Sequence, residues 1–239
     1  MRETTFHTTH WSVVLAARQP EQEAAAREAL ASLCSTYWYP LYVFIRHQGS
    51  TPGEAEDLTQ EFFYRFIERD SLLKVTPTAG KFRSFLLACL KNFLANERER
   101  ARAQRRGGGR VLFALDAGAA ETRYLPEPTD DVTPEVLFER HWASAVLERA
   151  LSRLKQEYAR RGQHEVFAVL EVFLPGSEAG SSRAETAARL GMSAGAVDMA
   201  VCRLRQRYGA MLREEVAQTV SSPEDVEDEI RYLISVFKT

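Results

Sequence analysis

Asn92 and Asn96 are four residues apart, so their side chains share one face of an expected helix. The asparagine amide carries a donor and an acceptor side by side, and proteins use this pair to read the edges of DNA bases. From residue 91 to residue 110 there are seven Lys and Arg against two Glu, and cationic side chains neutralise backbone phosphates. Lys81 and Arg83 add positive charge at the start of the same helix. Together these residues favour a nucleic-acid-binding face over an ordinary solvated one.

A second candidate surface lies in residues 182–208, SRAETAARLGMSAGAVDMAVCRLRQRY, which have the pattern of a helix-turn-helix. Gly191 ends the first helix, Met192 fills the corner and Ser193 caps the second helix. Helix pairs of this kind also occur in bundles that do not bind DNA, but the arginines of the second helix favour DNA. The residues expected to bury the first helix are Ala184, Ala187, Ala188 and Leu190; those that anchor the second are Val197, Val201 and Leu204; the arginines are Arg203, Arg205 and Arg207.

The sequence has no arrangement of residues typical of a catalytic or metal site. The histidines form neither an HExxH motif nor a Cys/His spacing for zinc. Residues 107–109 are three glycines without the GK[ST] of a phosphate-binding loop, which indicates a hinge. We therefore expect no enzyme activity, no cofactor and no metal. The histidines are His7, His10, His47, His141 and His164.

The net charge of the 239 residues is −2, from 31 Lys and Arg against 33 Asp and Glu. Taken alone, this total argues against a nucleic-acid-binding protein. The charge is segregated along the chain, however, at +5 over 91–110, +4 over 183–213 and −5 from residue 214 to the end. Two cationic segments followed by an acidic tail support the two candidate surfaces.

Length and composition indicate an ordinary globular protein of one large or two small domains. No apolar run reaches the roughly 18–20 residues of a membrane span, and the N-terminus lacks the apolar region of a signal peptide. Cys34, Cys89 and Cys202 form no CxxC pair and suit a reducing compartment. We expect a cytoplasmic protein that does not interact with membranes.

The elements expected to position these residues are helices, because no stretch shows sustained alternation of period two. Three helix starts combine a hydroxyl residue, a proline and an acid, at residues 51–54, 133–135 and 222–225. The fold class expected is all-α, with two small helical modules joined by a flexible linker, the second module being the helix-turn-helix. The expected helices are 21–48, 52–69, 80–105, 134–161, 163–174, 182–190, 193–213 and 223–237, and the expected domains are 1–105, a linker 106–133, 134–215 and an acidic helical extension 216–239.

The expected helix 52–69 has two different faces. One is apolar at helical spacing and predicts a core face. The other is acidic, and it is either an exposed acidic stripe, which is common, or a docking surface for a basic partner. The apolar residues are Ala55, Leu58, Phe62, Phe63, Phe66 and Ile67, and the residues of the other face are Asp57, Glu61, Tyr64 and Glu68.

The two modules together resemble an extracytoplasmic-function (ECF) sigma factor of bacterial RNA polymerase. The resemblance covers about residues 24–105 and 140–213. It rests on AEDLTQEF at 55–62, on FRSFLL at 82–87 with Lys91, Asn92 and Asn96, and on AETAARLGMS at 184–193. The segments THWSVVLAA and TYWYPLYVFIR further resemble a subgroup with a C-terminal extension.

This resemblance implies a sigma factor that binds core RNA polymerase and directs promoter-specific initiation. Its partners would be the clamp of the largest subunit, the flap of the second largest and promoter DNA, and an anti-sigma regulator is a further candidate. The loop around 74–80 would capture a base flipped from the non-template strand, and the linker would run toward the active-site cleft. The resemblance implies that the polymerase is bound by Asp57, Gln60, Glu61 and Phe62. It implies that the −10 element is contacted by Lys81, Arg83, Asn92, Asn96 and Arg98. It implies that the −35 element is contacted by Ser193, Asp198, Met199, Cys202, Arg203 and Arg207.

Some residues depart from the family pattern. Asp198 stands where a basic residue is frequent, and Ala200 where arginine is frequent. A carboxylate repels phosphate but accepts a hydrogen bond from cytosine, so Asp198 either reads a cytosine or weakens upstream binding. Asn96 replaces a common acid and Phe85 the usual tryptophan.

The acidic tail leaves two interpretations open. It is either a helix packed on the core of the second module, or an inhibitory segment that covers the cationic face of that module.

The function of the protein has alternatives as well. One is a conventional dimeric helix-turn-helix regulator that binds DNA without core polymerase, and another is a regulator that binds sigma or polymerase without reading DNA.

Overall fold

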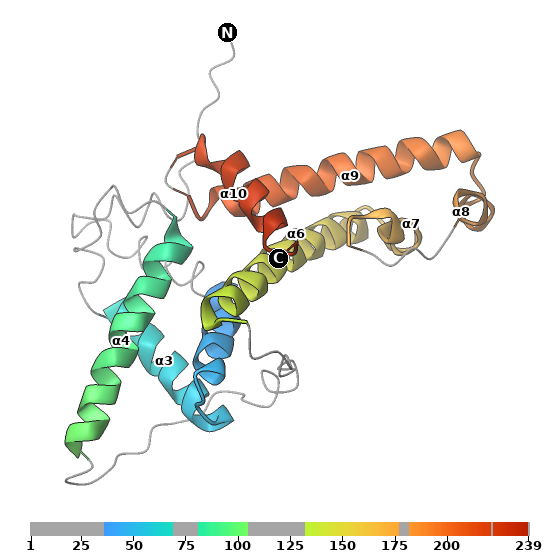
Figure 1. Cartoon of the computed structure of the whole chain (residues 1–239). Coiled ribbons are helices and arrows are strands. Elements are labelled where there is room, and N and C mark those ends of the chain that lie inside the picture. Colours follow the sequence, from blue (N-terminus) through green and yellow to red (C-terminus); the bar gives the residue numbers. More distant parts are fainter. Residues whose placement is uncertain (1–35, 69–80, 105–131, 177–181, 221, 239) are drawn as a thin grey trace. The chain divides into compact units, whose positions relative to one another are not determined.

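The computed structural model describes residues 36–68, 81–104, 132–176, 182–220 and 222–238 (Figure 1). No strand occurs in these ranges, so the all-α class is confirmed. The expected linker and the loop at 74–80 lie outside the described residues, apart from residues 132 and 133. A helix over 36–47 comes first; then follow α3 (Pro52–Glu68), α4 (Phe82–Gln104), α6 (Pro134–Arg160), α7 (His164–Leu170), η3 (Glu171–Phe173), α8 (Arg183–Leu190), α9 (Ala194–Ala217) and α10 (Asp225–Ser235).

The chain forms two compact units whose boundaries lie inside helices. Unit 1 comprises residues 1–145 and 216–239, and unit 2 comprises 146–215. The start of α6 and the whole of α10 therefore belong to unit 1. Both expectations for the acidic tail involved the second module, whereas its contacts group it with the first. The assignment of polymerase docking and −10 recognition to the first module, and of −35 recognition to the second, stays a prediction.

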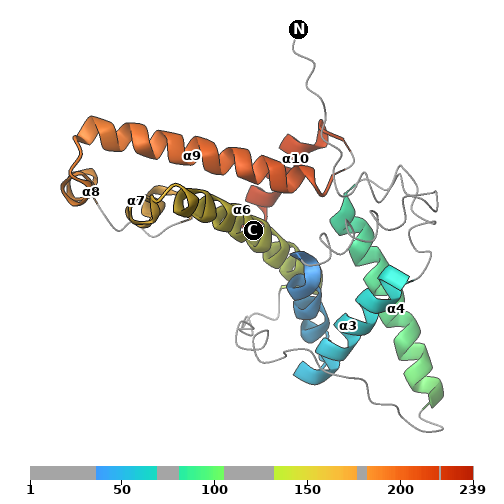
Figure 2. The same ribbon diagram turned by 180° about the vertical axis from the view of Figure 1, so that it is seen from behind.

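Unit 1 has an aromatic core. The helix over 36–47 contributes Tyr37, which is fully buried and meets Phe82 of α4 edge to face at 5.1 Å between ring centroids. Phe138 of α6 stacks on Tyr37 from another side at 6.4 Å. The neighbouring residues at i and i+4 spacing along α4, Leu86 and Leu90, are also fully buried. The apolar residues expected in the core of the first module thus hold α3 and α4 in place. Both helices can be followed in Figures 1 and 2.

Unit 2 is built on an antiparallel pair, the second part of α6 and most of α9, which run side by side in both views (Figures 1 and 2). Arg149 of α6 pairs with Glu215 of α9 at 3.0 Å. Further toward the other end of the pair, Glu157 of α6 lies 2.6 Å from Arg207. The anchors expected in α9, which are Val197, Val201 and Leu204, are at most 2% exposed and confirm that part of the pattern.

Local signals set the ends of several helices. Thr51 and Glu54 cap each other at the start of α3, and the hydrogen bonds from the Thr51 backbone and hydroxyl lower the pKa of Glu54. Ser182 and Glu185 form the expected capping box of α8. The start expected at Ser222 is different, because α10 begins at Asp225 and its side-chain cap is absent there. The amide of Asp225 instead donates to the Ser222 carbonyl.

The buried face of α8 differs from the expectation. The fully buried residue is Thr186, while Ala184 and Ala188 are exposed and Met192 is 40% exposed rather than filling the corner. The burial follows positions 183, 186 and 190, which are spaced three and four residues apart. The helix is therefore rotated by about one residue from the register that the alanines suggested.

Two glycines in this region provide a test of the turn. Gly191 ends α8 at φ +62°, a conformation that a side chain disfavours, whereas Gly195 lies inside the first turn of α9 with nothing within 4 Å of an added Cβ atom. We expect Gly191→Ala to lower the free energy of unfolding by about 1 kcal/mol and Gly195→Ala to raise it by about 0.5 kcal/mol. Urea denaturation of both variants would measure this difference in sign. Equal effects would contradict the assignment of the turn.

Candidate nucleic-acid interface

The expected base-reading pair on α4 is open to solvent. Asn92 and Asn96 are both exposed, one turn apart on the same face. The cations beside them already have partners within the protein. Lys91 lies 2.7 Å from Glu135, whose pKa the Lys91 hydrogen bond lowers, and Arg98 donates to the Gln48 side chain. Two uncharged amides thus lie beside one cation that is neutralised by a carboxylate, Lys91, and one that keeps its charge, Arg98.

Arg83 lies in a buried charge cluster of unit 1 instead. Its side chain is 8% exposed, and it donates to Glu229 of α10 at 2.6 Å and to Glu139 of α6 at 2.5 Å. The guanidinium carbon also lies 4.0 Å from the ring centroid of Tyr232 and 5.0 Å from that of Trp142. Two carboxylates and two aromatic faces therefore surround one cation.

The electrostatics of this cluster are strongly coupled. Burial lowers the pKa of Arg83, but the hydrogen bond to Glu229 and the charges of both carboxylates outweigh it, so the net shift is upward. Burial raises the pKa of Glu139 more than the Arg83 charge lowers it. Desolvation also raises the pKa of Tyr37, which lies fully buried beside the cluster. Removing one partner from such a buried pair costs about 3–5 kcal/mol.

This geometry changes the expected role of the start of α4. Arg83, Leu86 and Leu90 follow i, i+3, i+7 spacing, so Arg83 belongs to the buried stripe of the helix and is closed to DNA in this structure. Lys81 is 30% exposed and lies 2.5 Å from Glu229. Contact of both residues with DNA stays a prediction.

The expected docking residues on α3 differ in exposure, and Phe62 lies in the core rather than on the face of the other three. Asp57 is exposed, whereas Glu61 pairs with Arg65 at 2.5 Å and Gln60 donates to Glu56. Phe62 is 3% exposed and packs against rings of its own unit, including Phe63, Phe66 and Phe93. Its burial assigns it to the core, because a side chain closed to solvent cannot touch a partner without rearrangement.

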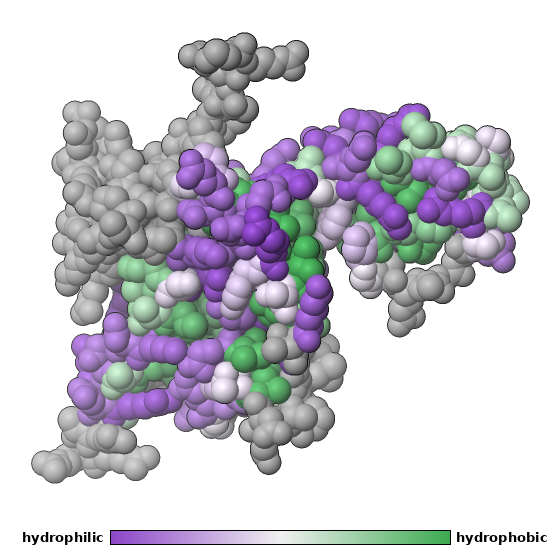
Figure 3. Space-filling model, turned by 45° about the horizontal axis from the view of Figure 1, so that its top comes forward, coloured by the Kyte–Doolittle hydropathy of each residue, from purple (hydrophilic) through white to green (hydrophobic). Residues whose placement is uncertain are grey.

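The outer face of α9 carries most of the expected −35 set. Met199 is 55% exposed, and Cys202 and Arg203 are exposed at i+3 and i+4 from it. These positions alternate with the buried anchors of the helix, so they share the solvent side. Small residues at the start of α9 make the α8 end of unit 2 pale in Figure 3.

Several of the polar residues expected on this face have partners within unit 2. Ser193 accepts from the amide of Ala196 and so caps α9. Asp198 lies 2.9 Å from Arg183, whose guanidinium carbon is 4.6 Å from the ring centroid of Phe173. The pattern of the second helix did not reveal this pair, because its basic partner precedes the turn.

The remaining arginines of α9 differ from one another. Arg207 donates twice to Glu157, and this hydrogen bond raises the pKa of Arg207. Arg205 donates to the carbonyl of Phe173 at 2.9 Å. Within the described residues, Arg203 makes no such hydrogen bond or ion pair. It is therefore the arginine of α9 best placed to meet another molecule.

Other chemistry is limited in the part of the chain that the structure describes. It contains no group of three or more His, Cys, Asp or Glu that could hold a metal ion. None of its helices combines the length and the apolar character required to cross a bilayer. The described residues define a helical protein with exposed amide and arginine side chains on α4 and α9.

Comparison with known proteins identifies this class further. Residues 44–216 match the family described as "ECF sigma factor", which spans most of the chain. The chain belongs to the ECF sigma factor family, a family of non-enzymatic transcription factors that bind core RNA polymerase and promoter DNA to start transcription. No curated protein and no solved structure gives a significant match.

The two arginines of α9 lead to a paired prediction. We expect Arg207→Ala to lower the free energy of unfolding by about 1 kcal/mol, because the substitution removes the ion pair with Glu157. The effect is modest because the Arg207 side chain is half-exposed. Arg203→Ala should change it by less than about 0.5 kcal/mol. Chemical denaturation measures both effects. A larger loss of stability in Arg203→Ala than in Arg207→Ala would contradict the assignment.

Proposed function

We propose that this sigma factor reads the −10 element with the exposed face of α4 and the −35 element with the outer face of α9. The observation that carries this proposal is the exposure of Asn92 and Asn96 on one face of α4, beside Lys91 and Arg98, which are held by Glu135 and Gln48. Because the neighbouring cations are bound within the protein, the exposed amides are the groups left to distinguish bases. Asparagine makes a bidentate contact with adenine, which suits an AT-rich element.

On α9, Arg203 is the group that contacts a base, and Met199 and Cys202 supply apolar contacts beside it. Asp198 keeps Arg183 close to the recognition face, so its negative charge is locally compensated. The pair supports a binding mode in which Asp198 accepts from a cytosine while Arg183 meets the adjacent phosphate. Upstream recognition then does not require the arginine that is frequent at Ala200.

The proposed polymerase contact is narrower than the expected set. Asp57 supplies an exposed carboxylate on α3, and Glu61 and Gln60 border it. Phe62 supports this surface from the core through its neighbours. The partner elements are the clamp of the largest subunit for α3 and the flap of the second largest subunit for unit 2, in a cytoplasmic protein; an anti-sigma regulator would compete for the same faces.

Transcription in vitro tests the whole proposal. The purified chain is mixed with core RNA polymerase and a promoter library, and the start sites are sequenced. We expect start sites that share two conserved elements. Tight duplex binding by the chain alone, with no effect of the chain on core polymerase, would instead identify a conventional regulator.

Reversing the charge of Asp57 tests the docking surface. Asp57→Lys should weaken binding to core polymerase about tenfold, because it places a cation against a basic partner surface. Asp228→Lys, which makes the same charge change at an exposed position of α10, outside both proposed polymerase contacts, serves as the matched control. Affinities are measured by titration of labelled protein with core enzyme. Equal affinity of the two variants would refute the docking assignment.

Cysteine footprinting tests the −35 face without any substitution. Cys202 is exposed on α9, while burial raises the pKa of Cys89 to about 11 and keeps that thiol unreactive near neutral pH. Promoter DNA should slow alkylation of Cys202 several-fold compared with the holoenzyme without DNA. Mass spectrometry of peptides measures both rates. Unchanged alkylation of Cys202 in a promoter complex would place the upstream contact elsewhere.

A further inference from the structure

Lys81 and Arg83 converge on a single carboxylate that comes from the far end of the chain. Lys81 Nζ lies 2.5 Å from one oxygen of Glu229, and Arg83 Nε lies 2.6 Å from the other. Glu229 is 1% exposed, yet Lys81 is 30% exposed and reaches the surface. The carboxylate therefore holds an accessible cation and a buried one at the same time.

The two cations depend on Glu229 to different degrees. Arg83 has a second carboxylate, Glu139, and the face of Trp142, both on α6, so it keeps a counter-ion when α10 leaves with Glu229 and Tyr232. Within the described residues, Glu229 is the acid that pairs with Lys81. Loss of Glu229 would leave Lys81 open to another anion without leaving a buried charge unpaired.

Lys81 is also aligned with the proposed base-reading face. Asn92 follows it by 11 residues, or about three helical turns, so the two positions share a direction about 16 Å apart along α4. A few nucleotides of one DNA strand span this distance. A phosphate of a strand read by Asn92 therefore comes within reach of Lys81.

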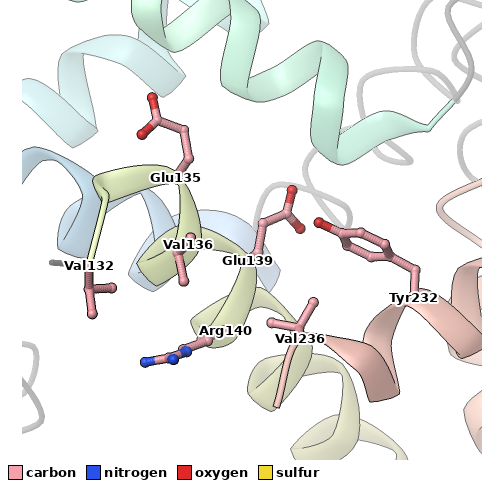
Figure 4. A pocket seen from close by; sticks show the side chains of 7 residues that line it. All are labelled: Val132, Glu135, Val136, Glu139, Arg140, Tyr232 and Val236. Carbon is pink, nitrogen blue, oxygen red and sulfur yellow. The ribbon is translucent and has the colours of Figure 1, made fainter. Parts of the chain in front are cut away.

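The helix that carries Glu229 is weakly attached. It has 11 residues, and a helix of this length is marginally stable in isolation. Ile234 and Phe237 remain 49% and 50% exposed, so part of its apolar surface is unused. Between α10 and α6 lies a cavity of about 390 Å³, across which Glu139 and Tyr232 face each other (Figure 4).

We propose that Lys81 binds a backbone phosphate of the promoter strand and that Glu229 of α10 occupies this position in the free protein. DNA and α10 then exclude each other at the start of α4, and binding of the strand releases α10. The proposal rests on the proposed function, because it assumes that α4 faces the −10 element. In this proposal the acidic tail inhibits the first module, whereas the sequence led us to expect that it acts on the second.

Binding of single-stranded DNA by the full chain tests this competition. The probe is a fluorescent oligonucleotide of randomised sequence, because a phosphate contact does not depend on sequence. We expect Glu229→Gln to bind it several-fold more tightly than the natural chain, with a salt dependence steeper by about 0.7, the value of one phosphate contact in a single strand. Asp228→Asn removes a charge from the same helix at an exposed position and should change neither quantity.

A second substitution separates Lys81 from a general loss of negative charge. Lys81→Ala combined with Glu229→Gln should abolish the gain in affinity. A folded Glu229→Gln variant with unchanged affinity would overturn the proposal, and so would a gain that survives Lys81→Ala. Circular dichroism establishes that the variants are folded.

Hydrogen exchange of the natural chain decides the matter even if the variants do not fold. Backbone amides of residues 225–235 should lose protection when promoter DNA binds the holoenzyme. Unchanged protection in a complex that initiates transcription would overturn the release of α10 while leaving the sigma function intact. Absence of initiation by the natural chain would instead refute the proposed function.

Discussion

The burial of the Arg83 charge is the constraint on which unit 1 depends. A guanidinium group cannot be moved out of water without counter-ions, so the residues that surround it must come together. Arg83 lies on α4, and its partners come from two other segments, the start of α6 and α10. The charge therefore brings residues 146 positions apart into one cluster and explains why unit 1 includes the C-terminal helix. Aromatic faces on two sides fix the guanidinium plane and leave little freedom for another arrangement.

This arrangement joins the two ends of the sequence through electrostatics rather than through a large apolar interface. The amide of Phe82 donates to the Thr219 carbonyl, so the backbone before α10 is fixed at the start of α4 as well. Val226 and Leu233 bury the apolar side of the helix around Glu229. A carboxylate in the middle of an apolar stripe makes the attachment specific for a basic partner and limits its hydrophobic strength. Another anion can replace the Glu229 carboxylate at its basic partners, whereas a purely apolar contact offers no group that an anion could replace.

Local signals in the sequence were sufficient for the helices and for most of the core. Helical period and capping residues depend on neighbours within one or two turns, which is why α3, the capping box of α8 and the buried anchors of α9 match the expectation, whereas the buried face of α8 does not. Pairing of charges depends on the tertiary fold, and it accounts for the main differences. Arg83 was expected at DNA because of its type, although its spacing with Leu86 and Leu90 already indicated a buried stripe. The partnership of Glu229 with Lys81 could not be derived, because any of seven acids in the tail satisfied the same net charge.

The same kind of pairing reduces the number of cations that are available to DNA. Arg65, Arg100, Arg153 and Arg207 each lie within 2.7 Å of a glutamate oxygen, so these arginines contribute little to the attraction of phosphates. Non-specific affinity for DNA grows with each unpaired cation, whereas base recognition requires only a few well-placed groups. A chain that neutralises its arginines internally and exposes Asn92, Asn96 and Arg203 separates these two contributions. Its attraction to DNA must then come largely from the polymerase to which it is bound, and its own side chains can supply sequence preference without holding DNA elsewhere.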